Sequence, residues 1–311
     1  MIQMHQPRRL RAFLLFISSL LCITLTPSLL FAQDDEEVIR VSTDLVILNL
    51  TVTNKSGQYV PGLKISDFKI FEDGKEITAD LVVSFSLHES PFASVVLLDT
   101  SGSMETRLSL ARSAAIRFLD RLRIEDVAAV FKFDSKIEQV QEFSGGRDLA
   151  PMAFGMRAKG MTKLNDAIVN AAKALAEREE KRKAIVVLSD GLDTNSNASS
   201  DKALESALAI GATIYTVDMS ATDGQSFRNQ QSAGMLKNFA EKTGGRFVAT
   251  PGGPALRDAF ESIADELGHQ YTVAYRPLNR AHDGKWRKLE VKANRDDLII
   301  RTRKAYRAPK K

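Results

Sequence analysis

Two carboxylates and three hydroxyl groups occur where they can share one cation. Asp99, Ser101 and Ser103 alternate along a short glycine-containing segment that directly follows an apolar run. Asp190 follows a second apolar run, and Thr162 lies between the two, in front of a helical pattern. Oxygen ligands of this kind suit a hard cation such as Mg²⁺, which prefers about six oxygens and usually keeps some water. The pattern therefore predicts a divalent-cation site at these five residues.

The segments before the two carboxylates indicate a parallel sheet. Continuous apolar runs end at Leu98 and Leu188, and such runs are typical of strands buried on both faces. We expect strands at 95–98, 128–131, 184–188 and 212–217, and helices at 108–122, 164–176, 202–210, 235–242 and 255–267. Their alternation predicts an α/β fold with a doubly wound, mostly parallel sheet. Ligands bind beyond the carboxyl ends of such strands, where Asp99 and Asp190 lie.

Both ends of the chain have the pattern of short β-strands. Residues 48–53 alternate apolar and polar side chains, as a strand with one buried face does. After Gly268 we expect strands at 270–275, 286–291 and 298–302, which are too few to bury a face alone. We therefore expect them to pack on the N-terminal strands and to form, from both ends of the mature chain, a small β-sandwich-like module.

The first 32 residues have the layout of a secretory signal peptide. Arg8, Arg9 and Arg11 precede an apolar stretch that ends near Ala32, and an acidic run follows. Cleavage after Ala32 would place the protein in the periplasm, in the cell envelope or outside the cell, whereas an uncleaved segment would anchor it in a membrane. The predicted divisions are 1–32 for the signal peptide, 33–90 for the N-terminal β module, 91–268 for the α/β domain and 269–311 for the C-terminal β segment.

Charge and polarity give three further expectations. Loss of three arginines and no acid with residues 1–32 lowers the net charge from +4 to +1, so the composition does not support a nucleic-acid partner. Residues 301–311, with six Lys or Arg and no acid, are expected to form a solvated tail. The polar stretch 222–234 is expected to be a surface loop.

The set Asp99-x-Ser101-x-Ser103, Thr162 and Asp190 resembles the metal-ion-dependent adhesion site of von Willebrand factor A domains. The resemblance covers roughly residues 91–268, and the flanking segments resemble those of bacterial exported proteins built around such a domain. It implies that Ser101 and Ser103 bind Mg²⁺ (or Mn²⁺ or Ca²⁺) directly. Thr162 and both aspartates would bind directly or through water. It also implies an open coordination position that accepts an Asp or Glu from a partner protein.

Three other interpretations stay open. Ser101 and Ser103 can instead cap a following helix, with Asp99 and Asp190 as ordinary polar residues at strand ends. The protein can also be a structural or assembly protein of the envelope in which a metal stabilises the fold. A hydrolase that uses the metal as a Lewis acid is less favoured, because no general base accompanies Ser101. We therefore expect an exported, non-enzymatic, metal-dependent protein-binding module.

Overall fold

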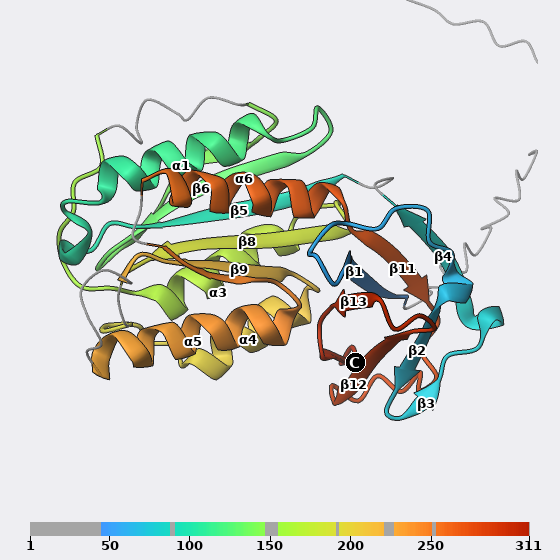
Figure 1. Ribbon diagram of the computed structural model, residues 1–311. Coiled ribbons are helices and arrows are strands. Elements are labelled where there is room, and N and C mark those ends of the chain that lie inside the picture. Colours follow the sequence, from blue (N-terminus) through green and yellow to red (C-terminus); the bar gives the residue numbers. More distant parts are fainter. Residues whose placement is uncertain are drawn as a thin grey trace, which may run out of the picture. The chain divides into compact units, whose positions relative to one another are not determined.

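The computed structural model describes residues 45–87, 91–146, 155–190, 193–220, 227–250 and 253–310, without the side chains of 227–229. The predicted signal peptide and its cleavage site lie outside the described residues. Residues 43–311 belong to one compact unit. Within it, the chain forms one six-stranded sheet and two four-stranded sheets (Figure 1). The predicted fold class, α/β with a mostly parallel central sheet, is confirmed.

The central sheet has the strand order β10-β9-β8-β5-β6-β7. Neighbouring strands are parallel except β6 and β7, which form an antiparallel pair at one edge. The strands are Phe92–Asp99 (β5), Val127–Phe133 (β6), Ile137–Ser144 (β7), Arg182–Ser189 (β8), Thr213–Asp218 (β9) and Phe247–Ala249 (β10). Every residue of β5 is buried, which is why its sequence is an apolar run without alternation.

Helices cover both faces of this sheet, with α1 and α6 on one face and α3, α4 and α5 on the other (Figure 1). The helices are Leu108–Asp120 (α1), Leu164–Ala176 (α3), Ser200–Ala209 (α4), Phe227–Thr243 (α5) and Pro254–Gly268 (α6). Alternate residues of β5 pack against the two helix layers. Val96 and Leu98 pack with α1 and α6, whereas Val95 and Leu97 pack with the other three helices. The sheet and both helix layers thereby fix the position of the strand that ends at Asp99.

Strands from both ends of the chain form the β module. One sheet has the order β13-β1-β11-β4 and the other the order β14-β12-β2-β3. Their strands are Val46–Asn54 (β1), Phe68–Glu72 (β2), Lys75–Glu76 (β3), Val82–Leu87 (β4), Tyr271–Tyr275 (β11), Trp286–Ala293 (β12), Leu298–Arg301 (β13) and Ala305–Arg307 (β14). A single apolar cluster that includes Leu48, Leu50 and Tyr271 draws on both sheets. The exact domain boundaries stay predictions.

A buried carboxylate connects the α/β domain to the β module. Glu266, near the end of α6, is 1% exposed. Its Oε1 accepts hydrogen bonds from Thr51 Oγ1 of β1 at 3.1 Å and from the Tyr215 hydroxyl of β9 at 2.9 Å. Arg301 of β13 forms an ion pair with the same carboxylate, and Arg246 Nε lies 3.8 Å from it. Side chains from both modules therefore depend on one charge.

Two stretches expected to be irregular are part of the fold. Of the expected surface loop 222–234, residues 222–226 lie outside the described residues, and residues 227–234 belong to α5, which begins at Phe227. The expected solvated tail is also wrong, because it includes strand β14 and the buried side chain of Tyr306. The edge strands β7 and β10 had no counterpart in the expected elements.

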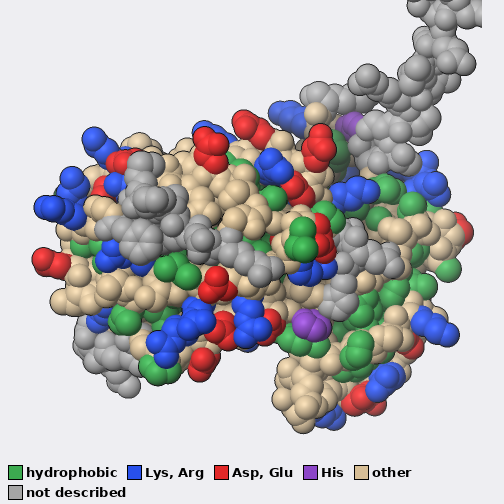
Figure 2. All heavy atoms as spheres, turned by 90° about the horizontal axis from the view of Figure 1, so that it is seen from above, with side chains coloured by type: hydrophobic (Ala, Val, Ile, Leu, Met, Phe, Trp, Pro, Cys, Tyr) green, Lys and Arg blue, Asp and Glu red, His purple; other side chains and the backbone are tan. Residues whose placement is uncertain are grey.

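The surface carries mixed charges where it can be seen. Figure 2 shows basic and acidic side chains interspersed over the face of α1 and α6, with no extended basic patch among the described residues of that face. Such a patch would be expected of a nucleic-acid-binding face. In the described part of the chain, no helix has the length and apolar character needed to cross a membrane.

Candidate metal centre

The carboxyl ends of β5 and β8 bring the two predicted carboxylates to one edge of the sheet. These strands are parallel neighbours, with Leu98 paired to Leu188. Asp99, the last residue of β5, therefore lies beside Ser189, and Ser189 Oγ donates a hydrogen bond of 2.5 Å to Asp99 Oδ2. Asp190 follows directly in the chain, which places both carboxylates at the same edge.

A tight turn after β5 brings the two serine hydroxyls together and directs that of Ser103 to Asp190. The backbone N–H of Ser101 donates to Asp99 Oδ1 at 2.8 Å, and Gly102–Met104 forms a single 3₁₀ turn. The Oγ atoms of Ser101 and Ser103 are 3.1 Å apart. Ser103 Oγ in turn donates to Asp190 Oδ1 at 2.7 Å. Four of the five predicted residues thus form one hydrogen-bonded chain.

The two serines do not cap a helix. Ser101 precedes the 3₁₀ turn, but its side chain makes no capping hydrogen bond. The α-helix begins only at Leu108, and its capping position is occupied by Arg107. The interpretation of Ser101 and Ser103 as helix caps is therefore wrong, since their hydroxyls bond to each other and that of Ser103 bonds to Asp190 instead.

The loop that carries Thr162 is attached to the turn after β5. The N–H of Gly102 donates to the carbonyl of Gly160 at 3.2 Å, and the N–H of Lys159 donates to the carbonyl of Thr100 at 2.8 Å. Thr162 itself is 5% exposed. Among the described residues, no hydrogen bond connects its hydroxyl to the other four predicted residues. Its loop is thus beside the site, and its role as a ligand stays a prediction.

Asp99 is a buried anion without a cationic partner. Its side chain is fully enclosed, and burial raises its pKa to about 6. Hydrogen bonds from Ser189 and Ser101 oppose this rise, whereas the charge of Asp190 adds to it. No Lys or Arg in the described part of the chain forms an ion pair with Asp99. A cation bound beside this carboxylate would offset the penalty of burying its charge.

Arg107 belongs to the site although the sequence pattern did not identify it. Its Nη1 lies 2.8 Å from Asp190 Oδ2, in an ion pair whose carboxylate side chain is 1% exposed. Ser189 was also missed, but the parallel register of β5 and β8 places it beside Asp99. No comparable signal points to Arg107, because its approach to Asp190 depends on the 3₁₀ turn between β5 and α1.

The chemistry of the donors fits a hard divalent cation. All side-chain donors of Asp99, Ser101, Ser103, Thr162 and Asp190 are oxygens, which Mg²⁺ and Mn²⁺ accept. The described residues contain no cluster of three or more His, Cys, Asp or Glu side chains that would form a different kind of metal site. The uncompensated charge of Asp99 supports the same fit.

Comparison with protein families identifies the central part of the chain. Residues 94–192, which run from β5 to just past Asp190, match the family model described as "von Willebrand factor type A domain". No curated protein matches the sequence.

One solved structure with a TM-score of 0.50 supports the fold at low sequence identity, and two others are similar at lower scores. A von Willebrand factor type A protein from Catenulispora acidiphila is 13% identical and superposes with a TM-score of 0.50, over 85% of this chain and 74% of that one. The vWF domain of the type V pili tip protein Mfa5 from Porphyromonas gingivalis is 15% identical (TM-score 0.49, 57% of this chain and 94% of that one). The PilB minor pilin from Streptococcus sanguinis is 14% identical (TM-score 0.46, 58% of this chain). The match spans 61% of that pilin.

Proposed function

Residues 94–192 of this chain are a von Willebrand factor type A domain, and on this premise we propose that the protein is a metal-dependent, adhesion-type protein-binding module. Asp99, Ser101, Ser103, Thr162 and Asp190 would hold the divalent cation. When bound, the cation supplies a Lewis-acidic position that an Asp or Glu of a partner protein can occupy. The observation that carries this proposal is the hydrogen-bonded chain from Asp99 through both serines to Asp190.

The charges around the site support a carboxylate as the incoming ligand. Only two of the five side chains are anionic, and Arg107 already neutralises part of the charge of Asp190 at 2.8 Å. Few uncompensated anions around a divalent cation leave it electrophilic, and an anionic group from outside is then attracted to it. The chain's own residues would thus hold the cation without fully neutralising its positive charge.

We do not propose an enzyme. Ser101 and Ser103 would need an adjacent base to act as nucleophiles. Among the described residues, neither serine is hydrogen-bonded to a histidine. The Ser101 hydroxyl bonds to that of Ser103, and the Ser103 hydroxyl bonds to Asp190, a carboxylate already paired with Arg107. The proposed location, outside the cytoplasm, rests on the signal-like residues 1–32, and membrane attachment would follow only if that segment is not cleaved.

The first test is a calorimetric titration of the purified protein with Mn²⁺ and Mg²⁺, compared with Asp99→Asn and Glu105→Gln. Asp99→Asn removes the buried charge and is expected to abolish saturable binding. Glu105 is exposed, lies two residues beyond Ser103 and is not one of the five proposed ligands, so Glu105→Gln is expected to bind normally. Equal binding by wild type and Asp99→Asn would contradict the proposed site.

A second measurement separates adhesion from a purely structural metal. Bound Mn²⁺ enhances the relaxation of water protons, and acetate, used as a probe for a partner carboxylate, is expected to reduce this enhancement by displacing water. Thermal unfolding is followed in parallel with and without Mn²⁺. A large gain in stability with no effect of acetate would favour the structural or assembly protein instead.

A further inference from the structure

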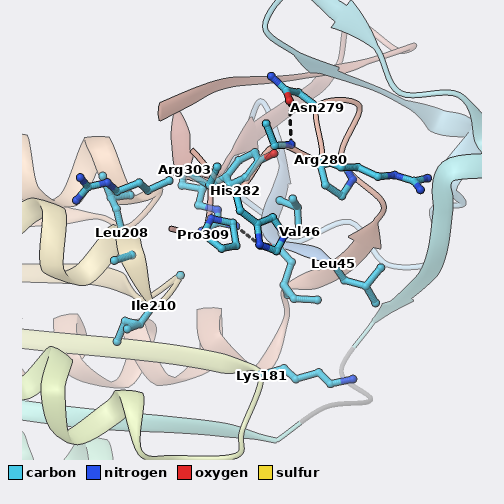
Figure 3. A pocket seen from close by; sticks show the side chains of 18 residues that line it. Leu45, Val46, Lys181, Leu208, Ile210, Asn279, Arg280, His282, Arg303 and Pro309 are labelled. Carbon is cyan, nitrogen blue, oxygen red and sulfur yellow. Dashed lines mark hydrogen bonds between the residues drawn. The ribbon is translucent and has the colours of Figure 1, made fainter. Parts of the chain in front are cut away.

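A cavity of about 260 Å³ lies between the β module and the turn that joins α4 to β9 (Figure 3). Leu208 and Ile210 contribute apolar lining from the α/β domain, and Leu45 and Ile47 contribute it from the start of β1. The cavity is at the opposite end of β8 from Asp190, since Lys181, which precedes β8, also lines it. It is therefore separate from the candidate metal centre.

The charges that line this cavity all have one sign. Lys181, Arg280, Arg303 and Arg307 are lining residues, and none of the lining residues is an Asp or a Glu. Arg307 forms an ion pair with Glu205 on α4. Lys181 and Arg280 are exposed. An anion entering this cavity would meet cationic side chains on a partly apolar wall.

Arg303 is the innermost of these cations, and one of its N–H groups has no hydrogen-bond acceptor. Its Nη2 donates to the carbonyl of Ile47 at 2.7 Å, but its Nε is buried and has no hydrogen-bond acceptor. No carboxylate among the described residues lies within ion-pair distance of it. Burial lowers the pKa of Arg303 to about 10, so the guanidinium is still charged at neutral pH. Its Cζ lies 5.8 Å from the ring centre of Tyr306.

Glu72, the buried carboxylate of this region, does not form an ion pair with Arg303. Glu72 accepts hydrogen bonds from the hydroxyls of Tyr275 and Tyr306 at 3.1 and 2.9 Å, and from the backbone N–H of Asn279 at 3.2 Å. These neutral donors occupy both of its oxygens. A guanidinium that is desolvated without a carboxylate is costly, and an anionic ligand would offset that cost.

We propose that this cavity binds a small amphiphilic monocarboxylate, with its carboxylate on Arg303 and its aliphatic chain against Leu45, Ile47, Leu208 and Ile210. A guanidinium presents a planar set of N–H donors that matches the two oxygens of a carboxylate. The volume is near the lower end of the range for ligand pockets, which favours a small molecule over a polypeptide segment. The proposal is independent of the metal centre.

The test is a calorimetric titration with octanoate, kept below its micelle-forming concentration, in the presence of EDTA. Because the metal is removed, the outcome does not depend on the proposed function. Octanol and acetate are titrated in parallel, since one lacks the charge and the other lacks the aliphatic chain. Saturable binding of octanoate, with much weaker binding of octanol and acetate, is the expected result. No binding of octanoate, or equal binding of octanol or acetate, would overturn the proposal.

Two sets of variants locate the site. Arg303→Met is expected to weaken octanoate binding by about tenfold or more, since hydrogen bonds to charged groups contribute strongly. Exposed Arg257 on α6 lies outside the cavity and provides the matched control Arg257→Gln. If Arg303→Met does not fold, substitutions of Ala209 test the site independently. It is exposed and lines the cavity, so Ala209→Asp should weaken binding several-fold while the uncharged Ala209→Asn should not. Equal binding by these last two variants would refute the site.

Discussion

Glu266 provides the sharpest test of how the two modules are held together. Its carboxylate accepts hydrogen bonds from Thr51 and Tyr215 and pairs with Arg301, so β1, β9 and β13 all depend on it. Glu266→Gln keeps the shape of the side chain and one carbonyl acceptor but removes the charge. Arg301 and Arg246 would then be left without this carboxylate.

The expected loss follows from how buried each partner is. Removing one member of a buried ion pair typically costs about 3–5 kcal/mol. The side chains of Arg301 and Arg246 are 31% and 33% exposed, so water compensates part of the loss. We therefore expect the free energy of unfolding to fall by about 2 kcal/mol. For a chain of this size this corresponds to a decrease in Tm of about 3–4 °C.

Urea unfolding with two probes measures both the loss and the coupling. Far-UV circular dichroism follows helices, which in the described residues belong mainly to the α/β domain, whereas Trp286, the only tryptophan, reports on β12. The two transitions should coincide in the wild type and separate in Glu266→Gln. Glu261→Gln on the same helix removes only a surface pair with Arg121 and should leave the stability nearly unchanged. Equal stability of the two variants would refute the assigned role of Glu266.

Three further substitutions test the site and the fold. Arg107→Gln removes a positive charge 2.8 Å from Asp190 and should raise Mn²⁺ affinity several-fold by calorimetry; unchanged affinity would contradict its assigned place. Gly160→Ala, at a φ of 78° and with a Cβ only 2.5 Å from Ser135 Oγ, should destabilise the protein by about 1–3 kcal/mol in urea and weaken Mn²⁺ binding. Gly245→Ala would drive a methyl group into the backbone of Ile214 and should cost about 1–3 kcal/mol in urea. Its control Gly234→Ala, in open space within α5, should not destabilise.

The sheet was predictable because burial on both faces leaves an unbroken apolar run. That pattern located β5, β6, β8 and β9, and helical periodicity gave the bounds of α3. The start of α5 was missed because residues 227–234 are polar and lack an apolar stripe. Strand β14 was missed because it is only three residues long, Ala305–Arg307, and has a single buried side chain, Tyr306. Pairing with β12, which the local sequence does not encode, defines that strand.

The site was predictable where it follows from strand ends and less so where it depends on turns. Asp99 and Asp190 stand at the ends of two neighbouring parallel strands, and the order of the strands alone brings them together. The bond from Ser103 to Asp190 requires the 3₁₀ turn after β5, whereas the spacing of Asp99, Ser101 and Ser103 indicated only that their oxygens can converge. Arg107 had no such indication, and its ion pair emerges only from the folded arrangement.

Because the first and the last described strands both belong to the β module, tension applied to the chain before β1 and after β14 would load that module first. β1 is the first described strand and β14 the last, and the whole α/β domain lies between β4 and β11 in the chain. A pull on the ends would therefore strain the contacts of β1 with β11 and β13, and those of β14 with β12. The edge that carries Asp99 and Asp190 would be relieved of load until those strands separated. The β module would therefore unfold under tension before the candidate site is deformed.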